Sequence, residues 1–195
     1  MQTQIPDIHA ALIALGENLA ADGQQAAVVV VGGTALILQG FAVRATQDVD
    51  VIAIGQDLTK EEGWALEDPE PLPEALTMAI ARVARDFNLP PDWMNNTIGL
   101  QWKTGLPPGL DQRVHWQQLE GLWLGLADRY DLIFLKLYAA ADSLGPSSVH
   151  FQDLVALQPT QDELDSAAVW VRSQDPSPVF GEILDQVLEH AKDYG

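Results

Sequence analysis

The stretch from Val28 to Ile52 most constrains what this chain can fold into, because it joins two strand-like segments through a glycine turn. Four consecutive valines, Val28–Val31, run directly into Gly32–Gly33. A short β-branched run bounded by glycines is typical of a fully buried strand. Residues 34–39 then predict a short helix that a glycine ends, and residues 49–54 predict a second strand. The sequence therefore predicts a compact strand–helix–strand unit.

Two carboxylates, Asp48 and Asp50, lie at the start of the second expected strand. Because side chains alternate between the two faces of a strand, this pair projects from one side, while Val49 and Val51 point to the other. Neighbouring carboxylates at the end of a buried strand repel each other unless a cation or an arginine lies between them. Hard divalent cations prefer oxygen ligands. Asp48 and Asp50 are therefore predicted to bind Mg²⁺ or Mn²⁺.

The order of these motifs resembles the signature of the nucleotidyltransferase-like, or polymerase-β-like, superfamily. The matching segments are Gly32-Gly33-Thr34-Ala35-Leu36, Arg44-x-Thr46 and Asp48-Val49-Asp50-Val51. The resemblance is closest to the bacterial abortive-infection and toxin–antitoxin branch and to related uncharacterised families. It is sharp across this stretch, and looser at Trp93–Asn96 and over Leu132–Leu157.

The resemblance implies a set of site residues for a nucleoside triphosphate and a metal ion. The nucleotide-binding residues would be Gly32, Gly33, Thr34, Arg44, Thr46 and Asn96. The catalytic residues would be Asp48, Asp50 and Lys136, the first two also holding the metal ion. A lysine point charge near the triphosphate would stabilise developing negative charge.

The superfamily completes its site with a third carboxylate on a later strand, and this sequence offers no obvious equivalent. Asp111 and Glu120 fall at turns, and Asp128 falls where the chain leaves the sheet. Glu120 is the candidate that we favour. Without a third carboxylate, two-metal phosphoryl transfer is weakened, and a catalytically silent relative becomes plausible.

Several of these residues also have a purely structural explanation. Arg44 could pair with Asp48 or Asp50, and Lys136 could extend along a half-buried helix to reach water. Trp93 is expected in the core, although the asparagines beside it, Asn95 and Asn96, could reach the nucleotide or the metal. Asp153 could cap a helix or bridge to Lys136, and we favour a structural ion pair there.

The chain is strongly acidic, with 28 Asp and Glu against 10 Lys and Arg and a net charge of −18. Proteins that bind nucleic acids need a basic stripe, because phosphate contacts dominate that affinity. The basic residues here are scattered singly, which argues against general nucleic-acid binding. The acidic surface indicates a self-repelling soluble protein or a docking face for a basic partner protein.

Cysteine is absent, which excludes disulfides, thiolate metal sites and thiol catalysis. The N-terminus lacks the basic region of a signal peptide, and the longest apolar run is too short to span a bilayer. A cytoplasmic location without a membrane partner is therefore expected.

The remaining pattern predicts an α/β fold of the nucleotidyltransferase-like type, a mixed sheet flanked by helices. The core would occupy residues 1–128, with a C-terminal helical extension at 129–195 packed on it. Helices are expected at Pro6–Asp22, Glu74–Asn88, Asp128–Ala141, Thr160–Arg172 and beyond the linker Asp175–Pro178. Strands are expected at Thr97–Lys103, Arg113–Gln118 and Leu119–Ala127, and an acidic, lid-like loop at Gln56–Pro73.

The sequence thus predicts a metal-dependent nucleotidyltransferase. It would move a nucleotidyl group from a nucleoside triphosphate to a hydroxyl of a protein or small molecule, as antitoxins do that modify a partner toxin. The alternative is a catalytically inactive binding module of the same fold, acting as an antitoxin-like partner or a scaffold.

Overall fold

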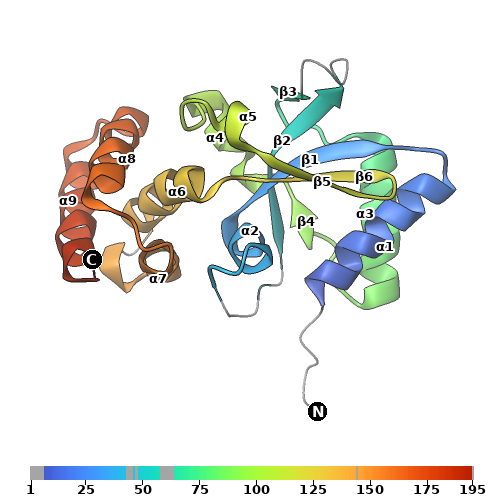
Figure 1. Cartoon of the computed structure of the whole chain (residues 1–195), viewed down its shortest axis with the longest axis horizontal. Coiled ribbons are helices and arrows are strands. Elements are labelled where there is room, and N and C mark those ends of the chain that lie inside the picture. The colour runs from blue at the N-terminus through green and yellow to red at the C-terminus, as the bar shows by residue number, and fades with distance from the viewer. Residues whose placement is uncertain (1–6, 43–45, 47, 58–63, 144, 195) are drawn as a thin grey trace, which may run out of the picture.

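A computed structural model describes residues 7–42, 46, 48–57, 64–143 and 145–194. Its described part is a mixed α/β structure built on a six-stranded sheet with helices around it (Figure 1). The strands are β1 (Ala26–Val31), β2 (Val49–Asp57), β3 (Trp64–Glu67), β4 (Met94–Asn95), β5 (His115–Leu119) and β6 (Leu122–Leu126). This confirms the predicted fold class.

The α-helices alternate with these strands and then continue alone to the C-terminus. They are α1 (Ile8–Ala21), α2 (Gly32–Leu38), α3 (Glu74–Phe87), α4 (Leu100–Thr104), α5 (Leu110–Arg113), α6 (Arg129–Asp142), α7 (Val149–Ala156), α8 (Gln161–Gln174) and α9 (Pro178–Ala191). Short 3₁₀ turns lie at Thr97–Gly99, Gly145–Ser147 and Lys192–Tyr194. Among the residues described, no helix combines the length and apolar character needed to cross a membrane.

The strands run in the order β3-β2-β1-β6-β5, and the short β4 also pairs with β2. Strand β1 is antiparallel to β2 and parallel to β6. The carboxyl ends of β1 and β6 therefore meet the amino end of β2 at one end of the sheet. The register pairs Val31 with Asp50 at that end.

The predicted strand–helix–strand unit is present and forms the centre of the core. All four valines of Val28–Val31 are fully buried, as the continuous β-branched run indicated. Helix α2 starts directly at Gly32, and the chain leaves it at Gly40, whose φ of +78° favours glycine. Helices α1 and α3 pack beside each other along the sheet (Figure 1).

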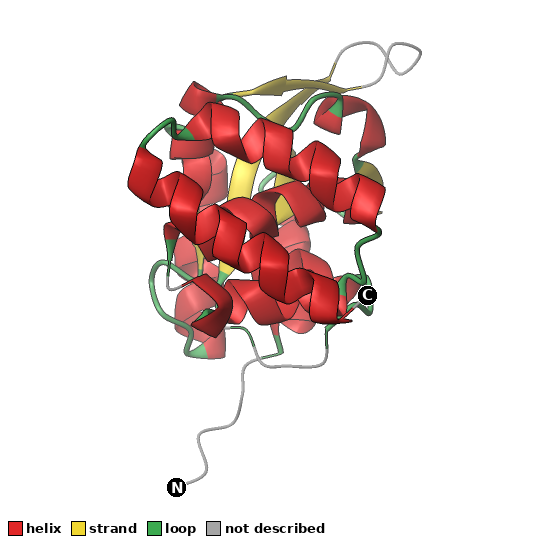
Figure 2. Ribbon diagram, turned by 90° about the vertical axis from the view of Figure 1, so that its left-hand side faces the viewer, coloured by secondary structure: helices red, strands yellow, loops and turns green. Residues whose placement is uncertain are grey.

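The C-terminal helices gather around α6, which follows β6 directly. Helix α6 packs against α7, α8 and α9, and also against α2 (Figure 2). The predicted capping box is present, since the Thr160 hydroxyl accepts from the Glu163 amide and the Glu163 carboxylate accepts from the Thr160 amide. Because α6 contacts both groups of elements, the division at residue 128 stays a prediction.

Two expectations about the connecting segments are wrong. Thr97–Lys103 is not a strand, because the Asn95 side chain accepts a hydrogen bond from the Thr97 amide at 3.0 Å and turns the chain into a 3₁₀ turn and α4. Gln56–Pro73 is not only a loop. Strand β2 continues to Asp57, and Trp64–Glu67 forms β3 against it, while residues 58–63 lie outside the described part.

Candidate functional site

The glycine turn after β1 lies against the second carboxylate of the aspartate pair. Gly32 has φ +69°, a conformation that side chains strain. A Cβ placed on Gly32 would lie only 2.2 Å from the Asp50 Oδ2 atom. The Asp50 carboxylate therefore rests on the backbone of Gly32, and both the conformation and the close approach require glycine here.

Asp48 precedes β2 and is held by hydroxyl groups on either side. The Thr34 hydroxyl, buried in α2, donates to the Asp48 carbonyl oxygen at 2.6 Å. The Thr46 hydroxyl donates to the Asp48 Oδ1 atom at 3.0 Å. Asp48 itself is exposed, whereas Asp50 is partly buried. The two carboxylates thus lie one residue apart across Val49, one facing water and one deeper in the fold.

The electrostatics of this pair show a shortage of positive charge. Burial raises the pKa of Asp50 from 3.8 to about 6, and the neighbouring Asp48 carboxylate raises it further, while the Lys136 ammonium lowers it. Two carboxylate groups with a raised pKa and an open side toward water suit a hard divalent cation. The residues present therefore fit the predicted Mg²⁺ or Mn²⁺ ion.

Lys136 is buried on α6 rather than extended to solvent. Its Nζ atom donates to the Asp153 Oδ2 atom on α7 at 2.7 Å, and the lysine is 4% exposed. The predicted ion pair with Asp153 is thus present, and Asp153 lies within α7 rather than at its cap. The effect of Lys136 on the pKa of Asp50 shows that its charge lies close to the aspartate pair.

Asn95, rather than Asn96, lies beside Asp50. Strand β4 places Asn95 directly opposite Asp50 in the parallel register. The Asn96 amide instead donates to the Pro69 carbonyl at 2.9 Å. Trp93 is fully buried, as expected of a core aromatic, and its indole N–H donates to the Ile80 carbonyl at 3.1 Å.

Residues 10–143 match the sequence profile of a family described as nucleotidyltransferase of unknown function (DUF6036). The match covers more than half of the chain. The chain belongs to this family. The matched region includes the glycine turn, both aspartates and Lys136, and it ends before Asp153. The nucleotidyltransferase-like resemblance is confirmed, while the abortive-infection and toxin–antitoxin branch stays a prediction. Neither the search of curated proteins nor the search of solved structures gave a match.

Two site residues predicted from the superfamily signature remain without a tested role. Arg44 lies outside the described residues, so its position is not part of this account. Gly33 is buried in the first turn of α2, next to Gly32. The nucleotide-binding roles of Gly32, Gly33, Thr34, Arg44, Thr46 and Asn96 stay predictions.

Glu120 does not supply the third carboxylate. It lies in the turn between β5 and β6, beside the start of β1 and at the opposite end of the sheet from Asp50. Asp128 caps α6 through the Tyr130 amide and binds the exposed His115 ring at 2.9 Å. Within the described ranges, no cluster of three or more histidine or carboxylate side chains could hold a metal ion. The Glu120 assignment failed because strand register, rather than spacing in the sequence, decides which end of the sheet a turn occupies.

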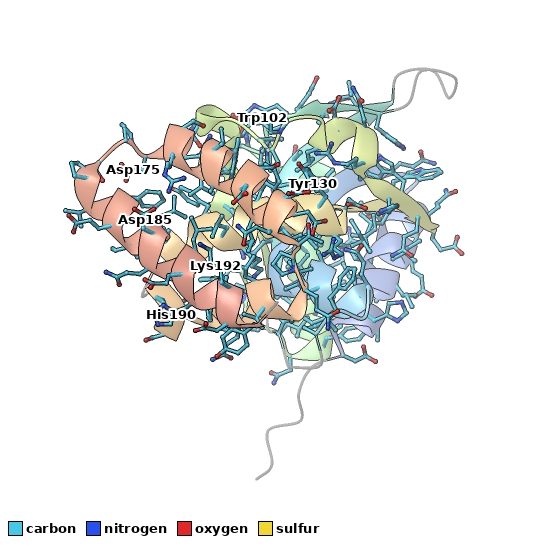
Figure 3. All side chains as sticks on the ribbon, turned by 60° about the vertical axis from the view of Figure 1, so that its left-hand side comes forward. Trp102, Tyr130, Asp175, Asp185, His190 and Lys192 are labelled. Carbon is cyan, nitrogen blue, oxygen red and sulfur yellow. The ribbon has the colours of Figure 1, made fainter. Side chains whose placement is uncertain are left out.

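Most of the basic side chains in the described part of the chain are already paired with carboxylates. Of the eight lysines and arginines there, seven form ion pairs: Arg82–Asp22, Arg85–Asp86, Lys103–Glu70, Arg113–Asp131, Arg129–Glu163, Lys136–Asp153 and Arg172–Asp185. Lys192 lies at the end of α9, the helix that also carries Asp185 and His190 (Figure 3). The surface therefore offers little uncompensated positive charge.

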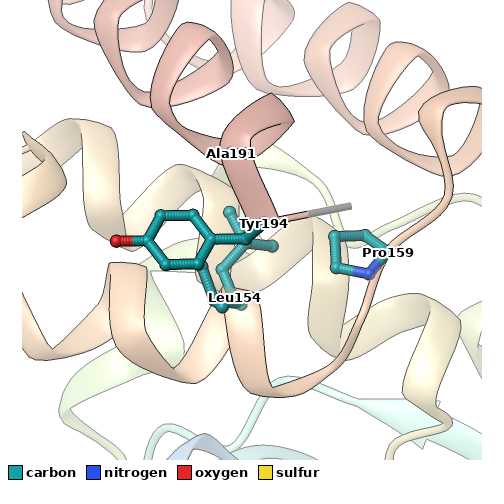
Figure 4. A pocket seen from close by; sticks show the side chains of 5 residues that line it. Leu154, Pro159, Ala191 and Tyr194 are labelled. Atoms are coloured by element: carbon teal, nitrogen blue, oxygen red, sulfur yellow. The ribbon is translucent and has the colours of Figure 1, made fainter.

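A small hollow lies among the C-terminal helices, away from the aspartate pair. It is lined by Leu154, Val155, Pro159, Ala191 and Tyr194 (Figure 4). Its volume of about 10 Å³ holds roughly one water molecule. This hollow is too small for a nucleotide.

Proposed function

We propose that this chain is a metal-dependent nucleotidyltransferase that moves a nucleotidyl group from a nucleoside triphosphate to a hydroxyl of a protein or small molecule. One observation carries the proposal. The Asp50 carboxylate lies on the backbone of Gly32, next to Asp48, at the end of the sheet where α2 begins. The family to which the chain belongs carries the name of the same activity.

Asp48 and Asp50 would hold the Mg²⁺ or Mn²⁺ ion. Such an ion neutralises phosphate charge and activates an acceptor oxygen when it is bound. Thr34 and Thr46 hold Asp48 in place through its carbonyl and carboxylate oxygens. Their hydroxyls therefore support the metal ligand, and we propose no direct contact of the Thr34 hydroxyl with phosphate.

Gly32 and Gly33 would cradle the phosphates, because small residues let a phosphate approach backbone N–H groups. Lys136 would neutralise charge on the triphosphate from the α6 side of the site. Arg44 would add a second positive charge, as the superfamily signature implies, and Asn96 would contact the nucleotide only if its amide left the Pro69 carbonyl.

The acceptor would be a protein side chain or a small molecule rather than a nucleic acid. The net charge of −18 and the pairing of seven described cations with carboxylates both oppose phosphate-backbone binding. A basic partner protein, as in a toxin–antitoxin pair, suits the acidic surface. We place this reaction in the cytoplasm.

A second candidate function is a catalytically silent binding module of the same fold. The observation that favours it is the neighbour of Asp50 on β4, which is Asn95 and not a carboxylate. Such a module would bind a nucleotide or a partner protein without turnover.

The test is calorimetric titration of Mg²⁺ together with each of the four nucleoside triphosphates, followed by a pyrophosphate-release assay with an extract of the source cells. The enzyme predicts binding that needs the metal, is lost in Asp50→Asn, and is followed by pyrophosphate release. Binding without release would support the silent module. Absence of metal-dependent binding would overturn both candidates.

A further inference from the structure

Two ion pairs join α6 to the helices that follow it, and they differ in burial. Arg129 at the start of α6 pairs with Glu163 on α8, with side chains 31% and 19% exposed. Lys136, about two turns later, pairs with Asp153 on α7, with side chains 6% and 3% exposed. A buried pair gains little stability over apolar side chains of similar volume, so the Lys136–Asp153 pair invites a role beyond packing.

The buried pair lies next to the aspartate site. Helix α6 packs against α2, the helix that starts at Gly32. The Lys136 charge is close enough to Asp50 to act on its carboxylate. A lysine ammonium has three N–H donors, and the bond to the Asp153 Oδ2 atom at 2.7 Å uses one of them.

We propose that Asp153 is a positioning residue that holds the Lys136 ammonium beside Asp50, where it binds the triphosphate of the substrate. This inference rests on the proposed function and adds that the C-terminal helices complete the nucleotide site. The family match ends at residue 143 and includes Lys136 without Asp153. A flexible lysine stem loses rotamer freedom when it is ordered, and a carboxylate on a neighbouring helix fixes it before the substrate arrives.

The experiment uses the whole chain and two calorimetric titrations, Mg²⁺ alone and Mg²⁺ with inorganic tripolyphosphate, a probe that carries no base. The variants are Lys136→Met, Asp153→Asn and the double variant, each verified as folded by circular dichroism. We expect both single variants to weaken tripolyphosphate binding about tenfold, the scale of one charge-assisted hydrogen bond. Binding of Mg²⁺ alone should stay unchanged, a result that a general loss of structure would not give.

The double variant decides whether Asp153 acts through Lys136. If it does, Lys136→Met with Asp153→Asn binds tripolyphosphate no more weakly than Lys136→Met alone. Additive losses, or wild-type affinity in Asp153→Asn, would overturn the inference while leaving the proposed function intact. The proposed function itself fails separately, if Asp50→Asn binds Mg²⁺ and tripolyphosphate as the wild type does.

A lone charge left in the buried position can prevent folding, so a second pair of variants keeps the test decisive. Lys136→Met with Asp153→Leu replaces the whole pair by apolar side chains, an exchange that folded proteins tolerate. The matched control is Arg129→Met with Glu163→Leu, which removes the other ion pair of α6. We expect the first to lose about tenfold in tripolyphosphate affinity and the control to lose none. Equal affinities in the two would contradict the inference.

Discussion

The carboxylate of Asp50 and the backbone of Gly32 constrain each other at the residue scale. Glycine is required twice, by its φ of +69° and by the 2.2 Å that would separate a Cβ from Asp50 Oδ2. Asp50 in turn is partly buried with a pKa raised to about 6, so it resists ionisation where no cation is present. A carboxylate kept in such surroundings indicates a ligand rather than a structural residue.

Gly32→Ala should lower the free energy of unfolding by about 1–3 kcal/mol, because alanine is strained at positive φ and its Cβ would displace Asp50. It should also abolish Mg²⁺ binding. Urea unfolding and calorimetry measure the two effects. Gly40→Ala is the matched control, since Gly40 has φ +78° with open space around it. It should lose some stability and keep Mg²⁺ binding. Equal metal affinity in the two variants would count against the close contact.

Asp50→Asn should stabilise the protein without metal. The folded-state pKa of about 6 lies above the unfolded value of 3.8, so stability is lost as pH rises from about 4 to about 6. Removing the carboxyl charge should raise the free energy of unfolding by about 3 kcal/mol at pH 7, and by roughly half as much at pH 5. Urea unfolding at the two pH values checks this. A variant less stable than wild type at pH 7 would refute the burial argument.

The short strand β4 decides the composition of the site at the scale of elements. It brings Asn95 alongside Asp50 and leaves Asn96 on the Pro69 carbonyl. The position beside Asp50 is the one from which a neighbouring strand could supply a third carboxylate. In this chain an amide stands there.

Asn95→Asp should therefore raise the affinity for Mn²⁺ about tenfold, because it adds a charged oxygen ligand beside Asp50. It should also lower stability without metal by about 1 kcal/mol through charge repulsion. Calorimetric titration with Mn²⁺ tests this, with Asn96→Asp as the control of equal charge. If both variants bind Mn²⁺ alike, a general gain of negative charge explains the effect and β4 has no special place.

Elements with a strong local pattern were predictable from the sequence. The valine run, the glycine turn and the Asp-x-Asp spacing gave β1, α2 and β2, and the apolar spacing at Asp128–Ala141 gave α6. Strand β4 was not predictable, since its two residues carry no periodicity, and a local Asn95 side-chain bond redirected the next segment. Placing Glu120 required the strand register, which the sequence pattern does not contain.

At the scale of the whole molecule, the charges of this acidic chain are largely satisfied internally. Seven described cations are paired on the chain itself, several of them bridging separate helices, such as Arg129 on α6 with Glu163 on α8. The ion pairs thus connect elements within the fold and leave little positive surface for a polyanion.

The chain should consequently bind neither transfer RNA nor duplex DNA at low salt. Nucleic-acid affinity depends on phosphate neutralisation and is strongest at low ionic strength, so 50 mM salt is a demanding condition. Fluorescence anisotropy with labelled RNA and DNA measures it, with a basic RNA-binding protein as a positive control. Affinity near 1 μM or tighter, falling steeply with added salt, would contradict the proposed acceptor class.

The most direct test of the account is Mn²⁺ binding by electron paramagnetic resonance, with and without a nucleoside triphosphate, in the wild type and in Asp50→Asn. The account predicts that the wild type binds Mn²⁺ and binds it more tightly with the nucleotide, while Asp50→Asn binds neither, although it unfolds at higher urea concentration. Wild-type Mn²⁺ binding in Asp50→Asn would contradict the central claim that Asp48, Asp50 and the Gly32 turn form the metal–nucleotide site.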